Sequence, residues 1–422
     1  VTSSLFITQL LGGTDVTALG ASHGWEHVRI WSGIEGYIPT AALSAQPPIS
    51  ADVGDCQYLD VPQPQPDVLP ASNGPFSLSA QGTTIAPATL YSSPDAQAVP
   101  QGAVGVGAQI SISHWAGDAS GQPWYQVTSA DGASGWVWSG AVQIDQPNPA
   151  TYQVGGKPVW QPVAGKGMWF TNYLTRRADL PTVMRAAKLA GITHIYAEVA
   201  ISRWGLYGAL SLDRLLPVAH AAGIAVIAWV YPVLDNVTAD IRMTERVAHY
   251  VTPSGDRPDG IATDVEEVTD SASVYSYGQV LRAALGPQTL LVCAVLHPFT
   301  HAGYPYAAVA ASWNVIAPMN YWHSSRSRSY HAADVQHFVT TSITTIRAAM
   351  ATSGHVLPVE ELGQSYDMFS ADGTESGHAP SGAEITAEMQ AAQALGCSGV
   401  SWFEWQTTTQ PEWTAIDDFR WG

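Results

Sequence analysis

The stretch Asp259-Gly-Ile-Ala-Thr-Asp-Val-Glu266 carries the clearest signal of both fold and chemistry in this chain. It begins as an apolar strand and delivers two carboxylates, Asp264 and Glu266, at its end. Side chains two residues apart on a strand point to the same face, so these two are expected to lie side by side. In a parallel barrel, reactive groups gather at the carboxyl ends of the strands. Most enzymes that cleave glycosidic bonds use two carboxyl groups a few ångströms apart.

The run over 260–268 is one of eight apolar runs that follow one another from about residue 167. Segments with helical periodicity separate them, and several of these end at a glycine, the residue best suited to a left-handed helix cap. Strands alternating with helices predict a parallel sheet, and eight units predict closure into a (β/α)8 TIM barrel over 155–422. The runs are 168–173, 194–201, 225–233, 260–268, 290–297, 315–322, 356–361 and 399–404. The helical segments are 180–190, 212–222, 239–250, 273–285, 333–352 and 383–395, and the glycines are Gly191, Gly223, Gly286, Gly354 and Gly396.

Residues 1–150 lack this helical rhythm and consist of short runs typical of β-strands, broken by Gly, Ser and Pro. Two stretches share the pattern Trp-x-x-Val, a turn, then Gly-aromatic-aliphatic, which resembles bacterial SH3-like modules. The repetition predicts two small all-β barrels, at 1–45 and 76–145. The matching stretches are Gly24-Trp-Glu-His-Val28 with Gly36-Tyr-Ile-Pro39, and Pro123-Trp-Tyr-Gln-Val127 with Gly135-Trp-Val137.

The resemblance to SH3-like modules implies binding of peptidoglycan or another cell-wall polymer. The alternatives are that the modules are spacers, or rigid props packed against the larger domain. Between the two, residues 46–75 are rich in proline and predict a semi-rigid, extended linker. A shorter proline-containing joint at 146–149 precedes the barrel. The expected organisation is therefore two small modules followed by one large domain.

Polar and aromatic side chains gather where the eight strands are expected to end. Aromatic rings stack on the C–H faces of a sugar and carboxylates accept hydrogen bonds from its hydroxyls, so this mixture favours a carbohydrate ligand. Core packing explains part of the aromatic residues, but it does not explain acids at five strand ends. We expect the substrate to be contacted by Trp169, Glu198, Trp229, Tyr231, Met319, Asn320, Trp402 and Glu404.

Over roughly residues 160–422 the chain resembles the family 18 glycoside hydrolases, the chitinase-like group. That family carries Asp-Gly-x-Asp-x-Asp-x-Glu on its fourth strand, where this chain has the stretch that ends at Glu266. Its sixth strand carries Met-x-Tyr, matched by Met319-Asn-Tyr321, and its eighth carries a tryptophan that floors the site, matched by Trp402.

The resemblance implies a retaining, substrate-assisted mechanism on a β-linked polymer containing N-acetylglucosamine, either peptidoglycan or chitin. Glu266 would protonate the glycosidic oxygen, and Asp264 would hold the substrate's N-acetyl group while its carbonyl oxygen attacks the anomeric carbon. Tyr321 would donate a hydrogen bond to that carbonyl. Burial and repulsion between Glu266 and Asp264 would both raise the pKa of the acid.

One departure from the family pattern leaves two further interpretations open. The family's middle aspartate, which exchanges a proton with the next one, is Ala262 here. A catalytically weak or inactive carbohydrate-binding or structural protein of the cell surface is therefore the alternative. A second one is a glycosidase of another class, with Glu404 or Glu361 acting beside Glu266 as the second carboxylate.

The composition narrows the range of partners. The 422 residues carry a net charge of −18 and include three lysines, which argues against nucleic acids and anionic membrane surfaces. No apolar run reaches the length of a transmembrane helix. The cell-wall-like modules, and a first residue other than methionine, predict a secreted or surface-associated product.

The sequence predicts a polysaccharide partner and no cofactor. No His or Cys spacing supports a metal site. Cys293 and Cys397 lie on or beside expected strands, which predicts small buried side chains rather than a disulfide framework. The glycan linkage, the effect of Ala262 on turnover, the oligomeric state and the source organism are not determined at this level.

Overall fold

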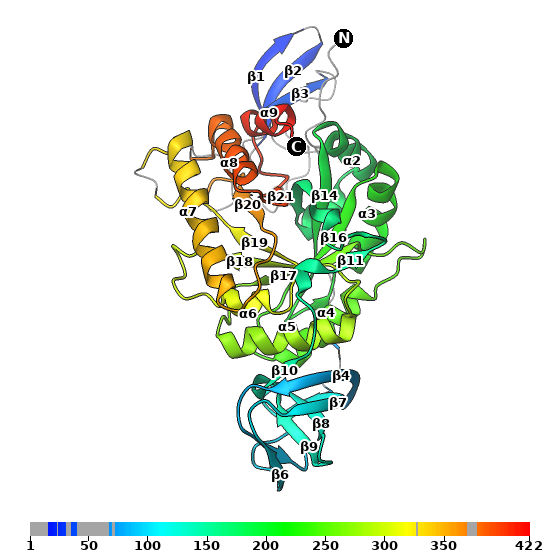
Figure 1. Cartoon of the computed structure of the whole chain (residues 1–422). Coiled ribbons are helices and arrows are strands. Elements are labelled where there is room, and N and C mark those ends of the chain that lie inside the picture. Colours follow the sequence, from blue (N-terminus) through cyan, green and yellow to red (C-terminus); the bar gives the residue numbers. More distant parts are fainter. Residues whose placement is uncertain are drawn as a thin grey trace.

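The computed structural model describes residues 16–22, 24–30, 35–39, 67–69, 72–325, 328–368 and 378–422. Within these residues, eight parallel strands close into a barrel ringed by helices (Figure 1). The first and last barrel strands pair with each other, which closes the ring and confirms the expected (β/α)8 TIM barrel. In chain order these strands are β13 (Gly165–Phe170), β14 (Ile192–Ile201), β16 (Ala225–Tyr231), β17 (Gly260–Val265), β18 (Leu291–Leu296), β19 (Val315–Met319), β20 (Glu360–Gln364) and β21 (Gly399–Phe403).

The helices lie on the outside of the barrel. The six expected segments are confirmed to within a few residues, while three shorter helices, α1, α6 and α9, were not expected. The five glycines predicted to end helices all have positive φ, the conformation that a glycine adopts without steric penalty. A short strand, β15 (Gly205–Leu206), pairs antiparallel with β14. The helices are α1 (Asn172–Arg177), α2 (Leu180–Leu189), α3 (Ala209–Ala222), α4 (Val237–Ala248), α5 (Ser271–Leu285), α6 (Tyr306–Ala310), α7 (Ala332–Ala351), α8 (Gly382–Ala394) and α9 (Gln410–Asp418).

The seventh strand begins later than its apolar run indicated. We expected it at 356–361, but β20 spans Glu360–Gln364. Val359 makes an isolated bridge to Ile316, and Pro358 before it has no N–H to donate to a ladder. The strand therefore starts beyond the proline, and it carries Gln364 rather than Val356 into the sheet.

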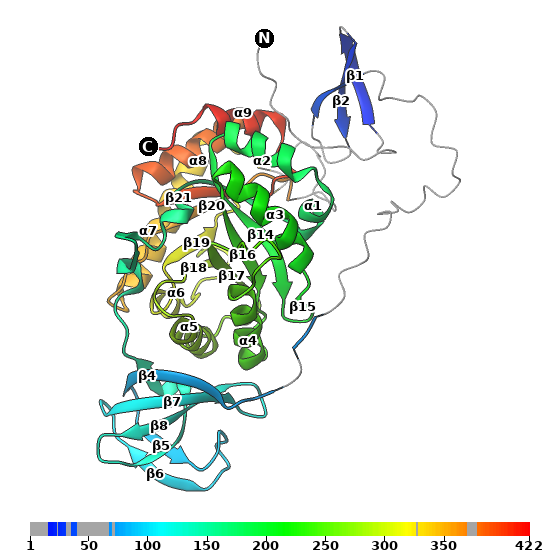
Figure 2. The same cartoon turned by 90° about the vertical axis from the view of Figure 1, so that its right-hand side faces the viewer.

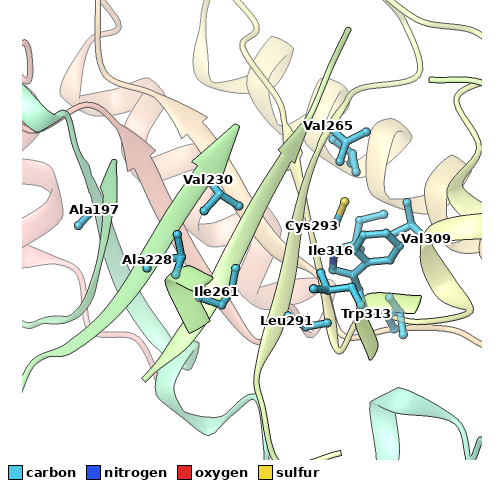
Figure 3. Close-up of a cluster of buried hydrophobic side chains, with 14 of the residues drawn as sticks. Ala197, Ala228, Val230, Ile261, Val265, Leu291, Cys293, Val309, Trp313 and Ile316 are labelled. Carbon is cyan, nitrogen blue, oxygen red and sulfur yellow. The ribbon is translucent and has the colours of Figure 1, made fainter. Parts of the chain in front are cut away.

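The barrel strands present two buried surfaces. Side chains that point inward fill the barrel with an apolar and aromatic cluster. Side chains that point outward pack against the helices, and Figure 3 shows part of that layer, where the ring of Trp313 lies close to residues of β18 and β19. Cys293 belongs to this outer layer and is a free thiol, as is the buried Cys397. The inward cluster includes Trp169, Tyr196, Trp229, Ala262, Met319 and Leu362.

Two antiparallel sheets precede the barrel. A three-stranded sheet consists of β1 (Val16–Ser22), β2 (Trp25–Ile30) and β3 (Glu35–Pro39). A seven-stranded sheet follows, in the order β10-β4-β7-β8-β9-β5-β6. Both are the all-β structure that the repeat predicted, while the SH3-like identity stays a prediction. The strands of the second sheet are β4 (Phe76–Thr84), β5 (Ala88–Tyr91), β6 (Pro100–Val104), β7 (Gln109–Gly117), β8 (Pro123–Ser129), β9 (Ser134–Trp138) and β10 (Val142–Ile144); a small hairpin, β11 (Gln153–Val154) with β12 (Lys157–Pro158), leads into the barrel.

The second sheet is docked on the barrel rather than held at a distance from it. It lies against α4 and α5 in both views (Figures 1 and 2). The backbone N–H of Ile144 donates to Gln279 Oε1 at 3.0 Å, and Ser139 Oγ lies 2.9 Å from Ser276 Oγ. Gly121 accepts at 2.9 Å from the backbone N–H of Thr238, near the start of α4. These contacts favour the rigid-prop alternative for this module.

Most of the predicted linker, with Cys56, lies outside the described residues. Its last part touches the barrel, because Asp67 bridges to Gly205 and pairs with Arg246 of α4 at 2.5 Å. No helix among the described residues combines the length and the apolar character that a bilayer crossing requires.

Candidate active site

Asp264 and Glu266 lie at the carboxyl end of β17, as their spacing predicted. Asp264 is only 4% exposed. Its Oδ2 accepts a hydrogen bond from Trp229 Nε1 at 3.1 Å. Its Oδ1 is buried and has no hydrogen-bond donor among the described residues. The neighbouring Glu266 carboxyl is close enough to interact with Asp264, and in its protonated form it could donate to that atom.

Burial raises the proton affinity of both carboxyls. Burial raises the pKa of Asp264 well above its usual range, and the adjacent charge of Glu266 raises it further. Burial also raises the pKa of Glu266, with a smaller contribution from Glu267, while a hydrogen bond from Asp264 opposes that rise. Both shifts favour the protonated forms, which is the direction that general acid catalysis by one member of the pair requires.

Trp229 is held in place by other rings. Trp169 lies edge-to-face with it at 5.0 Å between centroids, and Phe403 does so at 6.0 Å. Trp169 in turn stacks on Tyr196 at 4.2 Å and donates from Nε1 to Ser401 Oγ at 3.1 Å. Trp169 is 1% exposed, so it supports the site from below and does not contact a substrate, contrary to our expectation. The indole N–H that Trp229 presents to Asp264 is thus rigidly placed.

Two tyrosines extend the site. The hydroxyl of Tyr231 donates to Glu267 Oε1 at 3.2 Å, and burial together with Glu266 raises the Tyr231 pKa. Tyr321 lies edge-to-face with Tyr366 at 5.5 Å. Burial raises the pKa of Tyr321, and Tyr366, Asp264, Glu266 and Glu404 add to the rise, so its hydroxyl lies within electrostatic reach of these carboxylates. Met319, 6% exposed, lies in the inward cluster two residues before Tyr321.

Glu198 and Glu404 lie on the other side of this barrel end. Glu198 accepts from the backbone N–H of Asn172 at 2.9 Å and from the hydroxyl of Tyr207. Glu404 accepts from Gln406 Nε2. Burial raises the pKa of Glu404 to about 8, and the charge of Glu198 adds to the rise. None of the ion pairs among the described residues includes Glu404.

Asn320 and Trp402 are corrections to the predicted substrate contacts. Both are fully buried and point away from the barrel interior. Asn320 donates from Nδ2 to Glu361 Oε2 at 2.7 Å and accepts from Ser342 of α7. Trp402 donates from Nε1 to Glu388 Oε2 of α8 at 2.7 Å. Alternation along a strand explains both, since each follows or precedes a residue that points inward.

The two acids of β20 are likewise not part of the site. Glu361 points to the helix layer, where it contacts Asn320, so it cannot be a second catalytic carboxylate. Glu360 points into the barrel but lies deep inside it, 0% exposed, with its carboxylate bonded to His194 Nε2 at 2.9 Å and to the Tyr196 hydroxyl. Of the two acids proposed as alternatives, Glu404 alone remains near Glu266.

Two aromatic residues of the site were missed. Phe403 takes the inward position on β21 that was assigned to Trp402, and it contacts both Trp229 and Tyr321. Tyr366 follows β20, and the charges of Glu266 and Glu404 act on its pKa. Strand alternation from Ser401, whose hydroxyl binds Trp169 inside the barrel, would have identified Phe403. Nothing in the sequence marks Tyr366, because it lies in a loop.

Ala262 adds no carboxylate to the site, because its side chain is a methyl group. Ala262 is fully buried in the inward apolar cluster, beside Trp229 in the strand register. Trp229, rather than a second aspartate, is thus the hydrogen-bond donor that contacts Asp264.

Among the described residues, no group of three or more His, Cys, Asp and Glu side chains is arranged to hold a metal ion.

A cavity of about 320 Å³ lies elsewhere, between α4, β15 and residues 67–69 and 72–73. Arg242, Arg246 and Asn236 help to line it, and none of the carboxylates above does. It is formed where the linker runs along the barrel, and the guanidinium of Arg246 in its wall already pairs with the carboxylate of Asp67. The carboxylates at the ends of the barrel strands are therefore a stronger candidate for the active site than this cavity.

No family model matches the chain, and no curated protein sequence does. Solved structures that resemble it include a GH18 chitinase from Cycas revoluta in complex with (GlcNAc)3, at 12% identity and a TM-score of 0.46, over 60% of this chain and 99% of that one. A class V chitinase from Pseudomonas fluorescens Pf-5 aligns at 11% identity and 0.45, over 60% and 98%. The spore cortex-lytic enzyme SleL from Bacillus megaterium QM B1551 aligns at 11% and 0.41, over 61% and 74%. Similarity of this degree carries no weight for activity, which has to be argued from the residues.

Proposed function

We propose that this chain is a retaining glycoside hydrolase that cleaves a β-linked polymer containing N-acetylglucosamine, with peptidoglycan or chitin as the substrate. The observation that supports it best is the buried pair of Asp264 and Glu266 at the end of β17, with one Asp264 oxygen bound by Trp229 and the other open to a donor. An acetamido N–H of the substrate is a donor of the required kind.

In the proposed mechanism the proton moves within the pair when substrate binds. The substrate's N–H donates to Asp264, which then keeps its negative charge, and the shared proton passes to Glu266. Glu266 delivers it to the glycosidic oxygen as the acetamido carbonyl oxygen attacks the anomeric carbon. Water then opens the resulting cyclic intermediate, and Glu266 takes back a proton, so the anomeric configuration is retained. Tyr321 donates a hydrogen bond to the acetamido carbonyl in this arrangement.

The test is the release of reducing ends from peptidoglycan and from chitin by wild type and by Glu266→Gln. Loss of a general acid costs on the order of 10²–10⁴ in rate. Glu245→Gln, the same change on the outer helix α4, is the matched control and should retain wild-type turnover. Turnover that survives in Glu266→Gln would refute the assignment of the acid.

A carbohydrate-binding protein without turnover is the second candidate, and Ala262 is the observation that favours it. The inward cluster around Ala262 is apolar, so no second acid relays a proton to Asp264 from below. Such a protein would bind oligosaccharides and release no reducing ends from any of the polymers. Binding of N-acetylglucosamine oligomers by wild type, measured calorimetrically together with the turnover assay, separates the two.

The remaining parts of the proposal concern the whole chain. We place the protein outside the cell or at its surface, with the second sheet as a prop for the barrel and the first as a wall-binding module. Co-sedimentation of the full chain with purified peptidoglycan, compared with a chain lacking residues 1–45, tests that division of roles. Equal binding by both would remove wall binding from the first sheet.

A further inference from the structure

The loop between β16 and α4 connects the second sheet with the end of the barrel that carries the acids. It spans residues 232–236 and directly follows Tyr231, whose hydroxyl donates to Glu267 at 3.2 Å. The backbone N–H of Val268, the residue after Glu267, donates to the carbonyl of Val233 in the loop at 3.3 Å. The loop therefore continues β16 and is tied by this hydrogen bond to the chain that leaves β17.

The backbone of this loop is held in a conformation that it would not adopt by itself. Leu234 has a φ of 64°, in the left-handed region that residues with a branched side chain seldom occupy. Asp240 of α4, 1% exposed, accepts from the backbone N–H of Leu234 at 2.8 Å and from Ser202 Oγ at 2.6 Å. Ser202 Oγ in turn accepts from the backbone N–H of Val233 at 2.7 Å. Such a conformation persists only while its surroundings impose it, so the shape of the loop depends on the position of α4.

The second sheet contacts the start of α4, at the other end of the loop. Asn236 caps this helix, because its Oδ1 accepts from the backbone N–H of Ala239 at 3.0 Å. Gly121, in the turn between β7 and β8, accepts from the backbone N–H of Thr238 at 2.9 Å. A Cβ on Gly121 would lie 2.3 Å from Asn236 Oδ1. Asn236 can move aside only by giving up the cap, so the turn and the start of α4 hold each other in place.

We infer that the second sheet is a positioning element of the active site, and that it acts through the β16–α4 loop. Gly121 fixes the start of α4, Asp240 of the same helix holds the loop, and the loop holds the ends of β16 and β17. A misplacement of about 1 Å can cost on the order of 10²-fold in rate even when the substitution lies far from the chemistry. This inference rests on the proposed function, and it gives the second sheet a role in turnover beyond that of a prop.

The experiment compares Gly121→Ala with Gly132→Ala in the full chain. Both glycines lie in turns of the second sheet with positive φ, 81° and 90°, so both substitutions strain the backbone in the same way. A Cβ on Gly132 would meet nothing within 4 Å, so Gly121→Ala alone disturbs the contact with the barrel. Hydrogen exchange of the Leu234 and Val268 amides reports on the loop and on the end of β17. The kcat and KM for soluble N-acetylglucosamine oligomers report on catalysis.

We expect Gly121→Ala to exchange both amides faster than Gly132→Ala and to lower kcat by about tenfold, with KM changed by less than about twofold. Gly121→Ala/Asn236→Ser should restore both measurements, because serine is a shorter side chain that still caps a helix. Ser202→Ala is a second route to the loop that leaves the sheet contact intact. It removes the hydroxyl that Val233 and Asp240 share, so it should change exchange and kcat in the same direction as Gly121→Ala.

Three results would overturn the inference. Equal exchange and equal kcat in the two alanine variants would mean that the sheet contact does not reach the loop. Faster exchange at Leu234 with unchanged kcat would leave the loop without influence on the site. A loss of kcat that Asn236→Ser does not restore would trace the loss to something other than this contact. Failure of the proposed function looks different, since then no protein in the set releases reducing ends, while the exchange response is still measured.

Discussion

The buried acids of the helix layer make the stability of this protein depend on pH in a way that Glu361→Gln should reveal. Glu361 Oε2 accepts from Asn320, while its Oε1 is buried without a partner. Glu388, on α8, also has one unpartnered oxygen, and burial raises its pKa, with a further rise from the charge of Glu361. Burial raises the pKa of Glu361 itself from 4.5 to about 8.

The sign follows from proton uptake. Between the unfolded and folded pKa values of Glu361, the native state binds more protons than the unfolded state, so stability falls as pH rises. The contribution is complete below about pH 4.5 and is lost as the pH passes through about 8. A shift from 4.5 to about 8, at about 1.36 kcal/mol per unit, gives an upper bound on the order of 5 kcal/mol. Relaxation around the charge reduces what is measured.

Glutamine preserves the shape of Glu361 and removes its titration. Its carbonyl oxygen can accept from Asn320, and its amide can donate to the open oxygen of Glu388. Unfolding of Glu361→Gln by urea across this pH range should therefore give a flatter stability profile than wild type, with the variant more stable at the alkaline end. The profile keeps some slope, because burial also raises the pKa of Glu412 to about 8.

The control is Asp145→Asn, which removes an exposed carboxylate on the second sheet and should leave the slope unchanged. Parallel profiles for wild type and Glu361→Gln would refute the reasoning, because they would mean that Glu361 titrates alike in the folded and unfolded chain. A variant less stable than wild type at every pH would show that the glutamine amide finds no acceptor.

Three further substitutions have definite expected outcomes. Trp229→Phe removes a hydrogen-bond donor that lowers the pKa of Asp264, so the proton should stay on Asp264. We expect kcat to fall roughly 10–100-fold and the acidic limb of the pH–rate profile to move to higher pH. An acidic limb at the wild-type pH would contradict this reasoning. Tyr321→Phe should lower kcat by about tenfold and leave the melting temperature nearly unchanged, as its hydroxyl faces the carboxylates; equal kcat in the two proteins would remove it from the mechanism. Lys166→Met removes the buried ammonium that donates to the carbonyl oxygens of Ile416 and Phe419 at 2.5 and 3.0 Å. Both oxygens then lack this donor, so the free energy of unfolding, measured in urea, should fall by about 1–3 kcal/mol.

The order of elements was open to sequence reasoning because it depends on local patterns. Helical periodicity and glycines after the helices identified the alternation of strands and helices, and eight such units left a closed barrel as the natural arrangement. The placement of Asp264 and Glu266 also followed, since both lie on one short strand whose alternation is unambiguous. The start of β20 did not, because the apolar run that contains Pro358 reads as a strand, whereas Pro358 has no N–H to donate and β20 begins only at Glu360.

What the sequence by itself determined is therefore the barrel and the acidic pair at the end of β17. The tertiary structure alone decided which other side chains join them. Neighbouring side chains along a strand point alternately into the barrel and toward the helices. For this reason Phe403, and not Trp402, faces the site, and Asn320 contacts Glu361 in the helix layer. The hydrogen bond from Gln406 Nε2 to Thr171 Oγ1, just after β13, joins residues more than two hundred positions apart. Such contacts arise only when the barrel closes, because closure brings the first and last strands together.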